Sequence, residues 1–312
     1  SAYGEHLTWL WSRMLEQTWF FPWFDTRNET RMSVAHDDPQ RVHGGIIDML
    51  DAGNAYRDGY GAVINAPRDI PAADAIVPPC LITAYNGDPL QAHIDRLGVL
   101  PANWAARKVA TPKDHYAASV DFLLGHAETC VDNLPETPDA GFIAVRTAAF
   151  DGLIHWAGRR DSGVLRIHAP ARSAALVDVA GELAIDLPGH GLSHGWIGET
   201  PAEWAPWQAV IDAAAAALGA SLVDYAPLPV GDADQLYPDL SPDRHGAYLT
   251  RAWNIVRAEC FFAPWYDASA ATAISFPPEA VAPDALAKAH LARIRGVSAH
   301  GCHLARQSAG IL

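Results

Sequence analysis

Hydrophobic positions near the start of the chain recur at the spacing of a helix. Apolar side chains stand three and four residues apart at Leu7, Leu10, Trp11, Met14 and Leu15. This periodicity predicts one apolar face on an amphipathic helix. The sequence Phe-Pro-Trp-Phe follows at 21–24, and proline cannot continue a helix. We therefore expect a helix with an aromatic end.

The same pattern returns later at a constant offset of 242 residues. GEHLTWLWSRMLEQTWFFPWFD runs from Gly4 to Asp25, and GAYLTRAWNIVRAECFFAPWYD runs from Gly246 to Asp267. A second amphipathic helix is predicted after the first copy over 39–60, and a weaker counterpart after the second copy over 283–295. The chain therefore contains an internal repeat of helical segments.

Between the two copies the pattern changes to alternating strands and helices. A short apolar run over 76–85 enters the turn Asn-Gly-Asp-Pro, which predicts a buried strand. We expect a helix at 90–97, a strand at 104–109 and a helix at 116–125. An acidic, proline-bearing stretch at 128–140 is predicted to be a linker.

Beyond this stretch the pattern predicts a second α/β segment. Strands are expected as a hairpin at 142–146 and 153–157, and as single strands at 164–168 and 182–186. A helix at 205–218 closes the segment. The sequence therefore predicts five parts, which are a helical cap (1–60), an α/β segment (61–127), the linker (128–140), a second α/β segment (141–235) and a second helical cap (236–312).

Composition and charge exclude several classes of protein. With 312 residues the chain can hold one large domain or two modest ones. Lysine and arginine number 22 against 36 acidic residues, a net charge of −14, which argues against a nucleic acid partner. No apolar run approaches the roughly 18 residues of a membrane span. The four cysteines lack CxxC spacing, which predicts reduced thiols and a cytoplasmic protein.

Two segments resemble the lobes of α/β-hydrolases. VLRIHAPARSAALVDVAGELAIDLPGHGLSHGW, at 164–196, resembles the N-terminal lobe, with its Asp-x-Pro-Gly-His-Gly loop. VPPCLITAYNGDPLQAHIDRL at 77–97, with TPKDHYAASVDFLLG at 111–125, resembles the C-terminal lobe, and the aromatic repeats resemble the cap. The resemblance implies a mostly parallel sheet flanked by helices. The order is broken, as if a tandem of two hydrolases had lost its first and last lobes.

The resemblance also implies an acyl-transfer site, in which a carboxylate orients a histidine that activates a serine. Asp88 and His115 stand where the acid and the base of the family follow successive strands. Each also has an ordinary interpretation, because Asp before Pro is common in turns and His115 could be a solvated residue at a helix start. On the catalytic interpretation the enzyme hydrolyses a small apolar ester, lactone or related acyl compound, without a cofactor.

The nucleophile of such a site is missing from the sequence. No G-x-S-x-G occurs, and the second α/β segment continues from its last helix without the usual strand and elbow. Ser1 could be the end of a truncated elbow, although the repeat pairs it with Asp243 in a loop; we expect further sequence upstream. Pro170 replaces an N–H donor of the oxyanion region. The alternative to a hydrolase completed by a missing segment or another chain is an inactive pseudo-hydrolase that binds or assembles.

Other histidines and cysteines give weaker signals. His190 and His194 are four residues apart, but the surrounding glycines predict a loop rather than a metal-binding helix. His300, Cys302 and His303 are expected in a frayed tail. No metal and no nucleotide cofactor are predicted, since Gly-rich phosphate loops are absent.

The aromatic repeats and the open sheet edges bear on partners. The aromatic side chains of the repeat can form a core or interface, or can line a site for a small apolar substrate. Because neither half-hydrolase closes a sheet alone, we expect one composite sheet, within the chain or across a dimer. The two aromatic helices should pack with pseudo-twofold symmetry. A homo-oligomer or association with a complementary chain is therefore predicted.

Overall fold

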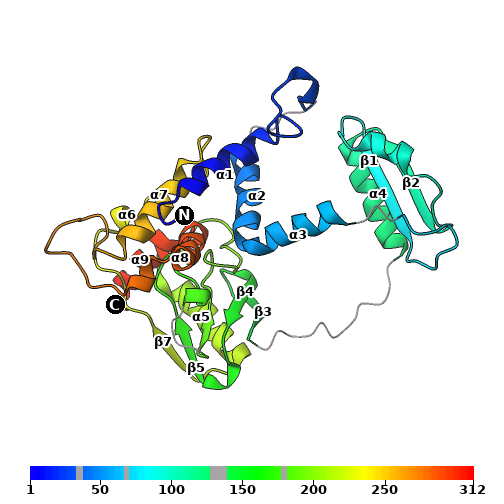
Figure 1. Ribbon diagram of the computed structural model, residues 1–312. Coiled ribbons are helices and arrows are strands. Elements are labelled where there is room, and N and C mark those ends of the chain that lie inside the picture. Colours follow the sequence, from blue (N-terminus) through cyan, green and yellow to red (C-terminus); the bar gives the residue numbers. More distant parts are fainter. Residues whose placement is uncertain (33–37, 67–69, 127–138, 177–180) are drawn as a thin grey trace. The chain divides into compact units, whose positions relative to one another are not determined.

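The computed structural model describes residues 1–32, 38–66, 70–126, 139–176 and 181–312. The chain divides into two compact units (Figure 1). The larger unit comprises Ser1–Trp11 with Asn133–Leu312, and the smaller unit comprises Ser12–Asp132. Both units contain helices and strands, which confirms the α/β class expected from the sequence.

A five-stranded sheet forms the centre of the larger unit, in the order β3-β4-β6-β5-β7. β3 and β4 form the predicted antiparallel hairpin, and β4 is also antiparallel to β6. β5 lies parallel to both β6 and β7. The bounds are β3 Ala140–Arg146, β4 Asp151–Ala157, β5 Val164–Ile167, β6 Leu183–Ile185 and β7 Leu222–Tyr225. The first four strands were expected, whereas β7 corrects the prediction that no strand follows the last helix of this segment.

Helix α5, Trp204–Leu218, supplies one wall of the core beside this sheet. Its side chains Trp207, Val210 and Ile211 are fully buried with the sheet residues Leu165 and Ile167. Burial of apolar surface contributes about 25 cal/mol per Å², so these large side chains supply much of the stabilisation. The helix fixes the parallel strands, whose carboxyl ends then frame the site described below.

The two copies of the repeat meet inside the larger unit. They are helix α7, Ala247–Ala258, and the part of helix α1, Glu5–Glu16, that precedes Ser12. The indole N–H of Trp11 donates to the carbonyl of Arg244 at 3.3 Å, and that of Trp253 donates to the carbonyl of Ala2 at 3.3 Å. Ala2 and Arg244 are equivalent at the repeat offset. The predicted pseudo-twofold packing is confirmed.

The structural repeat continues past the aligned sequence. After α1, Phe20 forms an antiparallel bridge with Arg31, and after α7, Phe262 forms the same bridge with Ala273. These two bridges differ by the repeat offset at both ends. Each copy is therefore a helix followed by an aromatic loop that the bridge closes. The bridge forms in both copies although Arg31 in the first is replaced by Ala273 in the second.

The helices that follow the two copies differ from each other. The single helix expected over 39–60 is wrong, because helix α2 spans Pro39–Ala52 and helix α3 spans Asn54–Asn65. Gly53 separates them with φ 50°, a conformation that glycine adopts without a Cβ penalty. Helix α8, Pro283–Arg295, has the predicted bounds.

A small parallel α/β element lies in the smaller unit. Strands β1, Cys80–Tyr85, and β2, Trp104–Val109, pair in parallel, and helix α4, Pro112–Gly125, packs on them. The expected helix at 90–97 is a 3₁₀ segment, Gln91–Arg96. α4 begins earlier than predicted, because Thr111 and Asp114 form a reciprocal capping box at its N-terminus.

These strands do not join the larger sheet. The described strands form a two-stranded sheet and a five-stranded sheet, so the composite sheet expected within one chain is wrong. Pairing across a dimer stays a prediction. The predicted linker at 128–140 lies outside the described residues up to 138, and Ala140 already belongs to β3.

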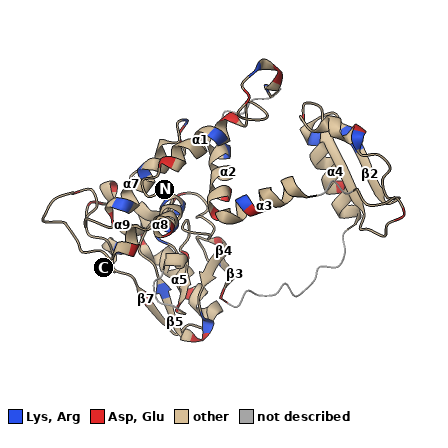
Figure 2. Ribbon diagram, in the orientation of Figure 1, with Lys and Arg blue, Asp and Glu red and all other residues tan. Residues whose placement is uncertain are grey.

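The C-terminal region is ordered rather than frayed. Residues Ala299–Ser308 form helix α9, and Cys302 and His303 are buried in it. The remaining short helices are α6 Ala233–Leu236 and the 3₁₀ segments Asn28–Thr30, Arg160–Ser162, Ala174–Leu176 and Pro278–Val281. Within the described ranges, no helix has the length and apolar character needed to cross a membrane. Acidic and basic residues are interspersed along the elements (Figure 2).

Candidate functional site

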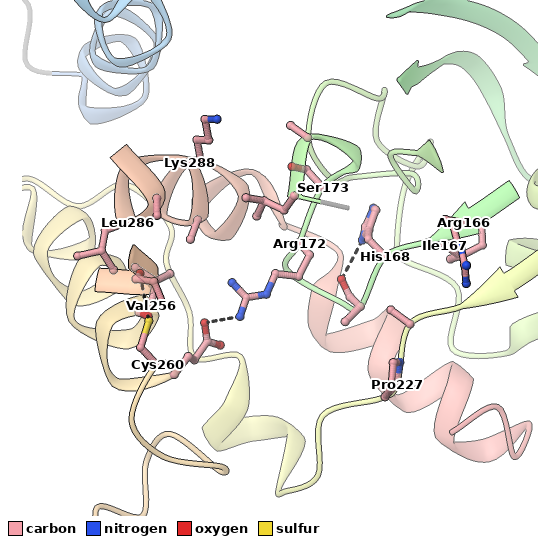
Figure 3. A pocket seen from close by; sticks show the side chains of 18 of the residues that line it. Arg166, Ile167, His168, Arg172, Ser173, Pro227, Val256, Cys260, Leu286 and Lys288 are labelled. Carbon is pink, nitrogen blue, oxygen red and sulfur yellow. Dashed lines mark hydrogen bonds and ion pairs between the residues drawn. The ribbon is translucent and has the colours of Figure 1, made fainter. Parts of the chain in front are cut away.

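A cavity of about 1010 Å³ lies in the larger unit, at the carboxyl ends of β5 and β7. The crevice outside the carboxyl ends of parallel strands is the usual ligand position in open α/β sheets. The sheet side of the cavity includes Ile167, His168, Ala226 and Pro227, and the opposite side, from α7 and its C-terminal end to α8, includes Val256, Glu259, Cys260, Leu286 and Lys288 (Figure 3). Most of the lining is apolar, and the charged side chains occupy defined places around it.

The imidazole of His168 is buried at the end of β5, with both ring nitrogens engaged. Nδ1 donates to the carbonyl of Ala169 at 2.8 Å, and Nε2 accepts from the backbone N–H of Leu187 at 3.1 Å. Burial holds the pKa of His168 below its ordinary value. His168 is therefore a neutral ring with no free nitrogen to take a proton from a nucleophile.

The carboxylate of Asp186, just after β6, is also fully committed. It accepts from Nδ1 of His155 at 2.8 Å, from the N–H of Ala174 at 2.6 Å and from the N–H of Leu192 at 2.9 Å. Burial opposes its ionisation, but these hydrogen-bond donors lower the pKa of Asp186. The carboxylate acts as a buried anchor that joins strand β4 to the segments at Ala174 and Leu192.

Gly191 is required by the same anchor. Its φ is 51°, and a Cβ at this position would lie 2.1 Å from Oδ2 of Asp186. The Asp-x-Pro-Gly-His-Gly loop thus owes its glycine to close approach of the carboxylate. The second glycine of this loop, on which the sequence resemblance partly rests, therefore has a structural role.

His190, in that loop, does not pair with His194 in a metal site. Nδ1 of His190 donates to the carbonyl of Pro188 at 3.1 Å, whereas Nδ1 of His194 accepts from the N–H of Leu153. Burial lowers the pKa of His190 to about 3. Within the described part of the chain, no three His, Cys, Asp or Glu side chains are grouped to hold a metal ion.

No activated nucleophile faces the cavity among the described residues. The chain leaves β7 as Ala226-Pro227, and the N–H of Ala226 donates to the carbonyl of Ile167. The single S–H of Cys260 is shared between the carbonyls of Val256 and Ala280, and burial raises the pKa of the thiol. A thiol with a raised pKa is a poor nucleophile.

Among the described lining residues, the remaining hydroxyls are those of Ser173 and Tyr225, and the Tyr225 hydroxyl donates to the side chain of Gln208 at 2.9 Å. Ser173 follows Arg172 in the loop after β5 and is almost fully buried. Neither nitrogen of His168 is available to it, since each already has a hydrogen-bond partner. Ser173 therefore lacks the adjacent base that activates a serine nucleophile.

The charged side of the cavity includes Arg172 and Glu259, and the buried Arg293, which is not part of the lining, shares the Glu259 carboxylate. Nη2 of Arg172 lies 3.2 Å from Oε2 of Glu259, and Nη2 of Arg293 lies 3.0 Å from Oε1 of the same residue. Figure 3 shows Arg172 extending from the loop after β5 toward α7. Neither the pairing nor the cavity was predicted, because its members come from segments far apart in the sequence.

Asp88 and His115, the site residues expected from sequence, lie in the smaller unit. Asp88 follows β1 and accepts from the N–H of Leu90 at 2.8 Å. Nδ1 of His115, in the first turn of α4, lies 2.5 Å from the hydroxyl of Thr83. The structure thus places both after successive parallel strands but gives each a different hydrogen-bond partner.

Ser1 has the loop role that the repeat gives to its counterpart. Its hydroxyl accepts from the N–H of Tyr3 and donates to Glu5. Asp243 accepts from the N–H of His245 in the same way, at the equivalent position. Both residues therefore organise the turn that precedes a repeat helix.

Comparisons with known proteins leave the family open. No family model and no curated protein matches the chain. One similar solved structure is a crystal structure of a variant of aCif, with 12% sequence identity and a TM-score of 0.33. The match covers 66% of this chain and 78% of that one. A similarity this low does not establish the fold.

Proposed function

We propose that the larger unit is an α/β-hydrolase-like module that binds a small apolar ligand in its cavity without carrying out triad chemistry. In the hydrolase fold, an antiparallel hairpin precedes the parallel strands, and the third and fourth strands exchange places in the sheet. The order β3-β4-β6-β5-β7, with β5, β6 and β7 parallel, has both features. This topology supports the family resemblance drawn from the sequence.

The observation that carries the proposal is the end of β7. In the hydrolase fold the strand at this place leads into the nucleophile elbow. Here it leads into Ala226-Pro227 at the cavity wall, and neither residue has a nucleophilic side chain. The cavity keeps the volume and apolar lining of a ligand site. The cavity thus supports ligand binding, whereas the part of the chain that the structure describes offers no nucleophile for hydrolysis at this place.

The proposal is tested with an ester and its unreactive analogue. The protein should release p-nitrophenolate from p-nitrophenyl octanoate no faster than buffer does. Octanamide should bind saturably in calorimetry, because its chain fits the apolar lining. Turnover that Ser173→Ala abolishes would contradict the proposal. Failure of octanamide to bind would contradict it as well.

A second candidate is the hydrolase expected from the sequence, with Asp88 and His115 in a triad completed by a nucleophile from elsewhere. The observation in its favour is that both residues follow successive parallel strands, β1 and β2. Carboxyl ends of parallel strands meet at one sheet edge, where catalytic residues gather.

Turnover of small apolar esters or lactones would distinguish this candidate. His115→Ala should abolish such activity, whereas His126→Ala, at the exposed end of the same helix, should leave it unchanged. Activity that survives His115→Ala would rule out the assignment of His115. The partner expected on this candidate is another segment or copy of the chain.

A further inference from the structure

The ligand cavity has a positively charged wall where a small acid could bind. Arg172 and Arg293 share Glu259, so two guanidinium groups face one carboxylate. Arg293 is nearly fully buried, and its Nε has no hydrogen-bond partner among the described residues. The local charge of this group is therefore positive by one unit.

Arg172 retains most of its capacity for hydrogen bonding. A guanidinium carries five N–H donors in a planar fork. Among the described residues, Arg172 forms one ion pair, which is with Glu259 at 3.2 Å. The side chain is 36% exposed and extends across the cavity (Figure 3). Free donors thus face the space in which a ligand would lie.

The opposite end of the cavity carries a net negative charge. Arg166 pairs with two carboxylates, those of Glu182 and Asp224. An anionic group would be repelled there and attracted toward Arg172. Between the two ends, apolar side chains such as Val256 and Leu286 line the wall. The cavity is therefore polarised along an apolar surface.

The charged residues at this end of the cavity are not required by the packing of the repeat helices. The residue equivalent to Glu259 in the first copy is Gln17, and the one equivalent to Cys260 is Thr18. Because the first copy forms its helix without a charged residue at this position, helix packing alone does not require Glu259. The ion pairs belong to the second copy, where the cavity lies.

We propose that the cavity binds a small apolar carboxylic acid as its anion, with the carboxylate on Arg172 and the hydrocarbon part against α7 and α8. The planar guanidinium fork matches a carboxylate in two parallel hydrogen bonds. Glu259 competes for the same cation and so limits the affinity. This inference rests on the proposed ligand-binding function, and it names the class of ligand.

Octanoate and octanamide are the probes, since they have the same chain length and differ in the charge of the head group. Calorimetry on the full chain should give an affinity for octanoate about tenfold higher than for octanamide. The difference should shrink in 1 M NaCl, because salt screens the exposed part of the interaction.

Three variants locate the effect. Arg172→Gln should weaken octanoate binding about tenfold and leave octanamide binding unchanged. Glu259→Gln should strengthen octanoate binding several-fold, because it removes the competing carboxylate. Arg146→Gln removes an exposed positive charge of the same unit that lies outside the cavity lining, and it should change neither affinity. Octanamide binding reports in each variant whether the cavity is intact.

The outcomes separate the two levels of the proposal. Equal affinities for octanoate and octanamide, unaffected by Arg172→Gln, would overturn the carboxylate inference and leave ligand binding in place. Binding of neither probe would overturn the proposed function together with the inference. If Glu259→Gln destabilises the fold, the comparison of Arg172→Gln with Arg146→Gln still decides the question.

Discussion

The indole ring of Trp11 occupies the space where Gly246 has no side chain. A Cβ on Gly246 would lie 2.3 Å from Cγ of Trp11, and the equivalent Cβ on Gly4 would lie 2.8 Å from Cγ of Trp253. Each repeat helix thus inserts its tryptophan against the glycine that precedes the other. Reciprocal contacts of this kind are the mark of an isologous interface, here formed within one chain.

Substitution of Gly246 should lower the unfolding free energy by more than its positive φ alone explains. Gly246 has φ 66° and Gly219 has φ 75°, but a Cβ at Gly219 meets no atom within 4 Å. We expect Gly219→Ala to cost about 1–2 kcal/mol of unfolding free energy. Gly246→Ala should cost about 1–3 kcal/mol more, because it also overpacks against Trp11. Urea denaturation of both variants measures the difference. Equal losses of unfolding free energy would show that Trp11 can move away from a Cβ at position 246 at no cost.

The buried carboxylate of Asp186 should be essential for folding rather than for chemistry. Asp186→Asn replaces one acceptor oxygen with a donor facing N–H groups, so we expect a loss of about 3–5 kcal/mol. The control is Asp151→Asn, whose ion pair with Arg146 is exposed and should contribute less than about 1 kcal/mol. Thermal unfolding checks both. A well-folded Asp186→Asn protein with unchanged stability would contradict the anchoring role.

Buried histidines should make the fold sensitive to mild acid. Burial lowers the pKa of His290 to about 4 and that of His190 to about 3. Below pH 6.5 the unfolded chain takes up protons that the native histidines do not, so stability falls as the pH falls toward 4. Each such histidine contributes up to about 1.4 kcal/mol per pH unit in that window.

Urea unfolding at pH 7, 6 and 5 measures this slope. His290→Gln should reduce the slope of unfolding free energy against pH by the equivalent of up to one bound proton. The variant should also be less stable overall, because it loses the hydrogen bond from the ring to the carbonyl of Leu249. Identical slopes for the original protein and His290→Gln would show that His290 does not remain neutral in the fold.

Much of the secondary structure follows from local patterns, and the errors have local causes. The bounds of β2 and α8 agree with the sequence prediction because their hydrophobic pattern and flanking residues coincide. The break at Gly53 was missed because apolar spacing continues up to it and a single glycine does not always end a helix. The short strand β7 was missed because four residues carry too little periodicity.

The site could be predicted less well than the fold. The apolar helix faces and the hydrophobic strand patterns predict an α/β sheet, but they do not predict its cavity. Arg172, Glu259 and Arg293 meet only once the loop after β5, helix α7 and helix α8 have packed. Sequence spacing carries no signal for such a tertiary ion pair. The saturated hydrogen bonding of His168 likewise depends on the distant N–H of Leu187.

The most direct test of the central claim is the intact mass of the full chain after incubation with an alkyl fluorophosphonate, with octanamide binding measured on the same sample. The account predicts no covalent adduct and saturable binding of the amide, because none of the described residues that line the cavity is an activated nucleophile. A stoichiometric adduct on Ser173, prevented by octanamide, would contradict it.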